Sequence, residues 1–246
     1  MCFRWRNKSS ALLTACLVLG LHAGSASQAA AQNISAGVNF LVGAPKGDFK
    51  DNVENAGFGI GGHIGYRFGQ SPFMAGLDLG YMIYGSETRT EPFSTTIPDV
   101  FVRVETTNNI FLGHFLLRMQ APYGKIRPYI DGVLGMHYLF TQTAIKDENR
   151  TDDETIASTT NQDDVAFSYG TGGGLMVQVH RAKKKETGKD GLQEVLVNFR
   201  IRYLFGSESE YLKEGSIRRE NGAVIYDLIT SRTDMLTFQL GVIFGF

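Results

Sequence analysis

The segment 195–205 constrains the fold more than any other part of this chain. Its odd positions are all apolar or aromatic, whereas the polar side chains Asn198, Arg200 and Arg202 occupy only even positions. Because successive side chains of a β-strand point to opposite faces, such a strand has one apolar face and one strongly cationic face. The segment therefore predicts a strand that separates an apolar environment from a polar one.

The same period of two recurs along the chain in about eight segments, as in the strands of transmembrane barrels. In such barrels the outer side chains face lipid and the inner side chains face a polar lumen. The sequence therefore predicts an all-β protein, a closed antiparallel eight-stranded up-and-down transmembrane β-barrel. We expect its strands at about 35–44, 58–68, 73–84, 100–119, 128–143, 165–179, 195–205 and 236–246.

Composition agrees with a barrel and argues against other classes of protein. The mean hydropathy of −0.11 is too low for a helical membrane protein, but a barrel alternates lipid-facing with lumen-facing residues. Basic and acidic residues number 24 and 25, so the chain lacks the basic excess that nucleic-acid binding normally needs.

The first residues, 1–31, have the pattern of a cleaved signal peptide. A cationic start is followed by an apolar run over 11–21 and by three alanines, which predicts cleavage before Gln32. The apolar run is too short for a transmembrane helix, which needs about 20 residues. An alternative reading is a lipobox that ends at Cys16, which would then carry a lipid. We favour the signal peptide, followed by one barrel domain over 32–246.

Both cysteines of the chain, Cys2 and Cys16, lie within the predicted leader. The mature domain is therefore expected to form no disulfide and no thiolate metal site, although it would enter an oxidising compartment. Three inward-facing histidines invite a metal hypothesis, but no ligand spacing on one element supports it. The acidic segment 146–164 lacks an EF-hand pattern. We expect no metal site and no cofactor.

The lengths of the connections predict how the barrel is oriented. Connections after the second and fourth predicted strands are short, whereas those after the third, fifth and seventh are long and polar. Outer-membrane barrels alternate short periplasmic turns with longer outer loops in this way, and both of their termini lie in the periplasm. The acidic loop 146–164 fits the long class, and the basic turn 181–191 is expected to be a frayed hairpin. Aromatic residues near the predicted membrane boundaries, such as Tyr66, Phe68, Phe73 and Tyr129, are expected to form an interfacial girdle.

An eight-stranded barrel has a bore that side chains can fill, so the inward charges must meet one another. The registers of the predicted hairpins bring Arg118 near Asp131 and His63 near Asp78, and set Gly172 and Gly174 opposite Arg202 and Arg200. Because a buried unpaired charge costs several kcal/mol, we expect a closed network that fills the lumen. The predicted structural network comprises His63, Arg67, Asp78, His114, Arg118, Asp131, His137, Asn198, Arg200 and Arg202.

Three segments carry a resemblance to a known family: Gly37 to Phe40, Gly76 to Tyr81 and Gly241 to Phe246. Across nearly the whole mature chain, the sequence resembles the small outer-membrane β-barrel family, with OmpX-like and OmpA-barrel-like members. The resemblance implies a place in the outer membrane of a Gram-negative cell, in contact with lipid and lipopolysaccharide. It also implies insertion by the outer-membrane assembly machinery, which would recognise the last strand with Phe246 as its signal. We expect a monomer.

Three functions remain open at this stage. We favour a non-enzymatic barrel with a structural or surface-interaction role, because the lumen is expected to be filled and the loops carry the variety. A narrow porin-like channel for small solutes comes second. A lipid A-modifying outer-membrane hydrolase comes third.

Some members of the family are such hydrolases, with a His-x-Ser pair on one strand. In this chain the nearest match, His137-Tyr138-Leu139, has leucine in place of the nucleophile. Ser168 faces the lumen, but nothing in the sequence sets it beside His114 or His137, and a serine attacks only when a base is within hydrogen-bond reach. We therefore predict no catalytic residues and no enzymatic activity.

Overall fold

The computed structural model describes residues 33–94, 97–147, 155–182, 191–220 and 223–246. The predicted leader 1–31, with Cys2 and Cys16, lies outside the described residues, as do 183–190 of the predicted basic turn. In the described part of the chain no helix is long and apolar enough to cross a bilayer. The elements are β1 (Ile34–Pro45), α2 (Asp48–Asn52), β2 (Gly57–Arg67), β3 (Phe73–Ser94), β4 (Ile97–Gln120), β5 (Ile126–Asp147), β6 (Thr155–Arg181), β7 (Glu194–Gly206), β8 (Glu208–Tyr211), β9 (Ile217–Glu220), β10 (Ala223–Tyr226), β11 (Ile229–Arg232) and β12 (Met235–Gly245).

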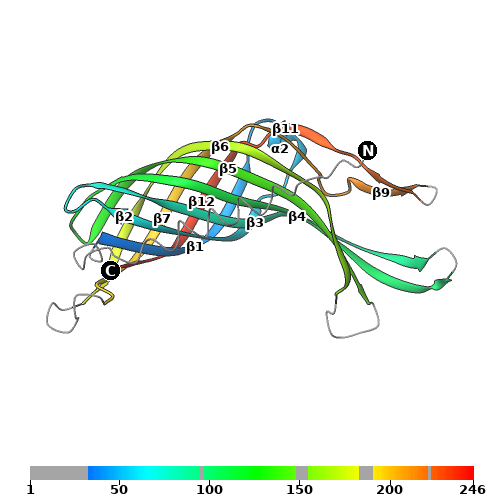
Figure 1. Ribbon diagram of the computed structural model, residues 1–246, viewed down its shortest axis with the longest axis horizontal. Helices are drawn as coiled ribbons and strands as arrows, with labels where there is room; N and C mark the ends of the chain where they lie inside the picture. The colour runs from blue at the N-terminus through cyan, green and yellow to red at the C-terminus, as the bar shows by residue number, and fades with distance from the viewer. Residues whose placement is uncertain (1–32, 95–96, 148–154, 183–190, 221–222) are drawn as a thin grey trace, which may run out of the picture.

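Eight strands form a closed ring in the order β1-β12-β7-β6-β5-β4-β3-β2. Every neighbouring pair is antiparallel, and β1 closes the ring because it pairs with β2 on one side and with β12 on the other. Figure 1 shows these strands slanting around a common axis, with the C-terminus at the end where the connections are short. The predicted architecture is confirmed, and the eight predicted strands correspond to β1–β7 and β12.

The outer surface of the ring is apolar, as the period of two requires. On β4, Phe115 and Leu117 are 69% and 67% exposed, whereas Leu116 between them is 1% exposed. Exposed apolar side chains continue in the same alternation around the other strands. An apolar surface that surrounds the whole ring is stable in contact with lipid hydrocarbon but not in contact with water.

Four strands are longer than the sequence predicts. The polar connection expected between the third and fourth strands is mostly strand, because β3 continues to Ser94 and β4 begins at Ile97. The acidic loop expected over 146–164 is also partly strand, since β6 begins at Thr155; residues 148–154 lie outside the described residues. Past the membrane neither face of a strand meets lipid, so the alternation weakens while the ladder continues. The Thr106 and Thr143 hydroxyls, for example, lie 3.1 Å apart across β4 and β5.

These extensions make a sheet that projects from the barrel, which we call the projecting sheet (residues 85–94, 97–108, 141–147 and 155–162). Figure 1 shows it curving away from the ring at the end opposite the C-terminus. We refer to this end as the long-strand end and to the other as the short-turn end.

The long-strand end of the lumen is covered by α2 and by the segment between β7 and β12. Phe49 of α2 is fully buried, with its ring centroid 5.8 Å from that of Tyr84 and 5.2 Å from that of Tyr211. The Tyr84 hydroxyl donates to the carbonyl oxygen of Leu212 at 3.1 Å. Five short elements were not predicted from the sequence, because each has only 4 or 5 residues and shows no periodicity: α2, β8, β9, β10 and β11.

Candidate functional site

Three buried arginines and two buried aspartates meet in the lumen. Arg118 of β4 lies 3.2 Å from Asp131 of β5. Arg202 of β7 bridges both acids, at 3.2 Å from Asp78 and 3.0 Å from Asp131, and Arg200 lies 2.8 Å from Asp78. All five residues are at most 5% exposed. The lumen is therefore crossed by a network of ion pairs.

The registers of neighbouring strands explain how part of this network forms. Arg118 is the direct partner of Asp131 in the β4–β5 ladder. Gly172 and Gly174 are the partners of Arg202 and Arg200 in the β6–β7 ladder. A Cβ atom built on Gly172 would clash with the Ile201 carbonyl oxygen and lie 2.9 Å from the Arg202 Cβ atom. Glycine is therefore needed on β6 because the backbone of β7 comes too close for a larger residue.

A layer of neutral polar side chains lies next to the ion pairs. The Tyr129 hydroxyl donates to the Asn198 side-chain oxygen at 2.7 Å, and the Asn198 amide donates to Asn39 at 3.4 Å. The Arg200 guanidinium donates to Gln239. The expectation that Tyr129 belongs to the interfacial girdle is wrong, since this side chain is 4% exposed and lies under Arg118, 4.0 Å from ring centroid to guanidinium carbon. Its position between the outward Pro128 and Ile130 was the signal that could have assigned it to the lumen.

Two histidines flank a buried serine at the other end of the network. The Ser168 hydroxyl lies 2.8 Å from His137 Nε2 and 3.1 Å from His114 Nε2. His137 Nδ1 lies 3.3 Å from the Thr233 hydroxyl. Ser168 therefore lies beside both histidines, a contact that was not predicted from the sequence. Ser168 is fully buried, however, and the third group of the cluster is a hydroxyl rather than a carboxylate.

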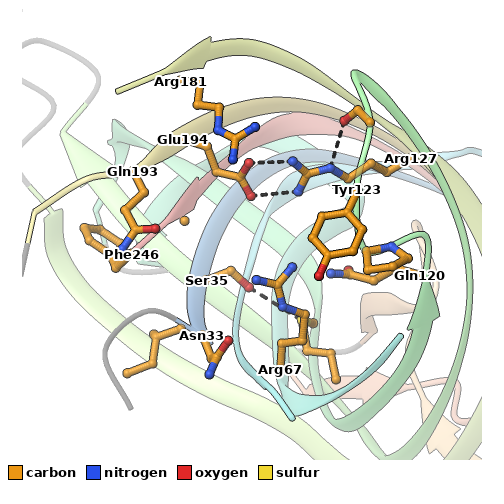
Figure 2. A pocket seen from close by; sticks show the side chains of 15 residues that line it. Asn33, Ser35, Arg67, Gln120, Tyr123, Arg127, Arg181, Gln193, Glu194 and Phe246 are labelled. Carbon is orange, nitrogen blue, oxygen red and sulfur yellow. Dashed lines mark hydrogen bonds and ion pairs between the residues drawn. The ribbon is translucent and has the colours of Figure 1, made fainter. Parts of the chain in front are cut away.

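His63 and Arg67 are the remaining residues of the predicted network. His63 is the register partner of Asp78, but neither of its ring nitrogens has a hydrogen-bond partner within the described residues. Arg67 lies at the short-turn end, where it lines a cavity together with Phe246 (Figure 2). The backbone N–H of Phe246 donates to the Ile34 carbonyl at 2.9 Å. Within the described chain, no group of three His, Cys, Asp or Glu side chains is arranged to hold a metal ion.

Comparison with known proteins agrees with this architecture. The sequence profile of a family described as "Outer membrane protein beta-barrel domain" matches residues 13–213. No curated protein matches the chain.

Several solved structures are similar to this chain in fold at low sequence identity. Neisserial surface protein A is 10% identical over 87% of this chain and 96% of its own, with a TM-score of 0.39. A major outer membrane protein from Thermus thermophilus is 8% identical over 87% and 99%, with a TM-score of 0.46. The N-terminal β-barrel domain of Pseudomonas aeruginosa OprF is 15% identical over 87% and 98%, with a TM-score of 0.32. The profile match covers most of this chain, and the chain therefore belongs to the outer membrane protein beta-barrel domain family.

Proposed function

We propose that this protein is a non-enzymatic outer-membrane barrel with a blocked lumen, which presents its projecting sheet for interaction at the cell surface. The observation that carries the proposal is the closure of the lumen at two levels. The ion-pair network of Arg118, Arg200 and Arg202 crosses the bore, and Phe49 seals the long-strand end. A lumen closed at these two levels leaves solutes no continuous path through the barrel.

The projecting sheet supports the surface role because one of its edges is open. Residues 155–163 of β6 pair with β5, and within the described residues no other strand pairs with them. The opposite edge, on β3, is bridged instead: Arg89 donates to the Ile217 carbonyl at 2.6 Å, and the Gly215 amide donates to Glu87 at 3.0 Å. An unpaired edge strand offers a row of backbone donors and acceptors to an added strand. We therefore propose strand addition to β6 as the mode of interaction.

The proposed setting follows from the family. The predicted signal peptide 1–31 would direct export, and the assembly machinery would insert the barrel through β12 and its terminal Phe246. The short-turn end, with both termini, would then face the periplasm, and the projecting sheet would face outward. Lipid and lipopolysaccharide would cover the apolar outer surface of a monomer.

Conductance of the purified protein in planar bilayers tests the blocked lumen. We expect no steady single-channel steps from the native protein. Steady steps would refute the blocked lumen and favour the narrow-pore alternative.

Photo-crosslinking in cells tests the surface role. A photoreactive residue at Ser158 on the open edge should crosslink to a polypeptide, whereas one at Ala144 on the interior strand β5 should do so much less. Equal yields at Ser158 and Ala144, or crosslinks to lipid alone, would contradict strand addition.

One observation favours a second candidate, a lipid A-modifying hydrolase. The Ser168 hydroxyl and His137 Nε2 are 2.8 Å apart, within the reach that a nucleophile and its base require. Against this candidate, Ser168 is fully buried in the lumen, so no substrate carbonyl reaches its hydroxyl. Incubation with labelled lipopolysaccharide should release no acyl chain. Acyl release that is lost in the H137A variant would establish the hydrolase and overturn our proposal.

A further inference from the structure

The cavity at the short-turn end of the lumen has no role in the surface interaction proposed above. Its volume is about 150 Å³, and it is lined by residues from all eight strands of the ring and from the turn 122–124. Figure 2 shows polar and cationic side chains pointing into it. Those that matter for its chemistry are Arg67, Gln120, Tyr123, Arg127, Arg181 and Glu194.

The single side-chain carboxylate that lines this cavity among the described residues, Glu194, is already paired with a cation. Arg127 binds it with two parallel hydrogen bonds of 2.7 and 2.6 Å, and Gln178 donates to it at 2.9 Å. A bidentate pair of this kind uses both carboxylate oxygens. Glu194 is therefore the partner of Arg127 and does not neutralise the other cations of the cavity.

Two further arginines reach the cavity without a carboxylate partner. Arg67 and Arg181 make no ion pair within the described residues, and the buried Nε of Arg67 has no hydrogen-bond partner. Figure 2 shows them on either side of the Arg127–Glu194 pair. An irregularity in the β6–β7 register between Gln178 and His180 makes Arg181 the direct partner of Glu194. Because a bulge redirects the side chains that follow it, Arg181 faces the cavity instead of the outer surface.

The lumen behind the cavity adds to the positive field. There, Arg118, Arg200 and Arg202 share only Asp78 and Asp131. Cations therefore outnumber side-chain carboxylates both at the mouth and behind it, among the residues that the structure describes. A cleft lined by one sign of charge between low-dielectric walls concentrates ions of the opposite sign.

We propose that this cavity binds an oxyanion, the phosphate or carboxylate group of a soluble molecule, between Arg67 and Arg181. Guanidinium groups match the oxygens of these anions in geometry and stay charged at every physiological pH. Gln120 and Tyr123 line the same cavity and supply neutral donors. A cavity of about 150 Å³ exceeds the ~10–15 Å³ that one water needs, so it holds an anionic group with a few waters. Because the cavity lies inside the ring, its ligand enters from solution rather than from the bilayer.

Titration with inorganic phosphate tests the proposal on the full barrel, folded in zwitterionic detergent micelles at constant ionic strength. Isothermal titration calorimetry should detect binding to the native protein. The R67Q and R181Q variants should each weaken it at least fivefold, and the double variant more than tenfold. Arg232→Gln is the matched control, since Arg232 is exposed at the opposite end of the barrel and its loss should leave phosphate binding unchanged.

The outcomes separate the alternatives. Absence of phosphate binding, or equal binding by the native protein and the double variant, would overturn the site. If R67Q fails to fold, judged by its mobility on unheated gels, R181Q alone decides, because Arg181 is exposed and its replacement should not disturb the fold. Repeating the titration in nanodiscs distinguishes the source of the anion. Equal affinity in phosphatidylcholine and phosphatidylglycerol discs supports a soluble ligand, whereas competition by phosphatidylglycerol would assign the site to a lipid headgroup and refute a soluble source.

Discussion

The substitution Asp131→Asn tests the lumen network most directly. Asp131 accepts hydrogen bonds from Arg118 and Arg202, at 3.2 and 3.0 Å, and lies 3.7 Å from Arg200. Its loss leaves three buried arginines with Asp78 as their remaining carboxylate. Removing one partner of a buried ion pair costs about 3–5 kcal/mol, because the other charge stays buried without compensation. We expect D131N to lower the free energy of unfolding by about 4 kcal/mol, a large part of the 5–15 kcal/mol typical of a folded domain.

Urea titration of the barrel in phospholipid vesicles measures this free energy, with the folded fraction read from the band shift on unheated gels. Asp227→Asn is the matched control: Asp227 lies 2.7 Å from Arg218, but both side chains are about half exposed. Pairs at the surface contribute about 0–1 kcal/mol, so D227N should have a small effect.

A double variant sharpens the test. Within the described chain, Asp131 is the carboxylate that pairs with Arg118. The D131N/R118M variant removes one of the uncompensated charges and should be more stable than the sum of the two single variants predicts. A loss in D131N no greater than in D227N would refute the reasoning, since it would mean that the buried arginines do not depend on Asp131.

Three further predictions concern the packing of the lumen and its cover. The F49A variant should loosen the cover of the long-strand end by about 3 kcal/mol, seen as faster amide hydrogen exchange in α2; unchanged exchange would contradict this. The G174A variant should destabilise the barrel by about 1–3 kcal/mol in urea titrations, because its Cβ would clash with the Phe199 carbonyl oxygen and with the Tyr129 hydroxyl, whereas G132A, with its nearest atom at 3.9 Å, should not. A backbone N–H of β8 donates to Asp164, outside the membrane-spanning part, and lowers the pKa of this carboxyl. The contribution of Asp164 to the docking of β8 is therefore complete above the ordinary aspartate pKa of about 4 and lost as the pH falls below it; an NMR titration of the β8 amides that shows no change there would disprove it.

The strands and their faces were predictable because hydrocarbon outside and a polar lumen inside impose a period of two. Beyond the membrane this difference between the two faces is lost, and the period of two is lost with it. The stretch 155–164 reads as an acidic loop because neither face of the strand meets lipid, yet it pairs with β5 as far as Thr155. The α2 helix leaves no trace in the pattern, since a single buried side chain, Phe49, holds it in place.

The contacts of the candidate site also fall into two groups, those that the sequence predicts and those that it does not. Contacts between neighbouring strands follow from the register of a hairpin, and the pairing of Arg118 with Asp131 across β4 and β5 is of this kind. Contacts across the lumen do not. Arg202 of β7 reaches Asp131 although β6 lies between their strands, and it reaches Asp78 across the bore.

Such contacts depend on the tilt and stagger of the closed barrel, which no single hairpin specifies. Ser168 illustrates the difficulty, because its hydroxyl reaches His137 on the adjacent strand and His114 one strand further on. The register partner of Ser168 is Gly135, so neither histidine stands directly opposite the serine. The connection between β5 and β6 is long and does not fix this register from the sequence. A sequence can therefore state which side chains share a lumen, but the geometry of closure decides which of them meet.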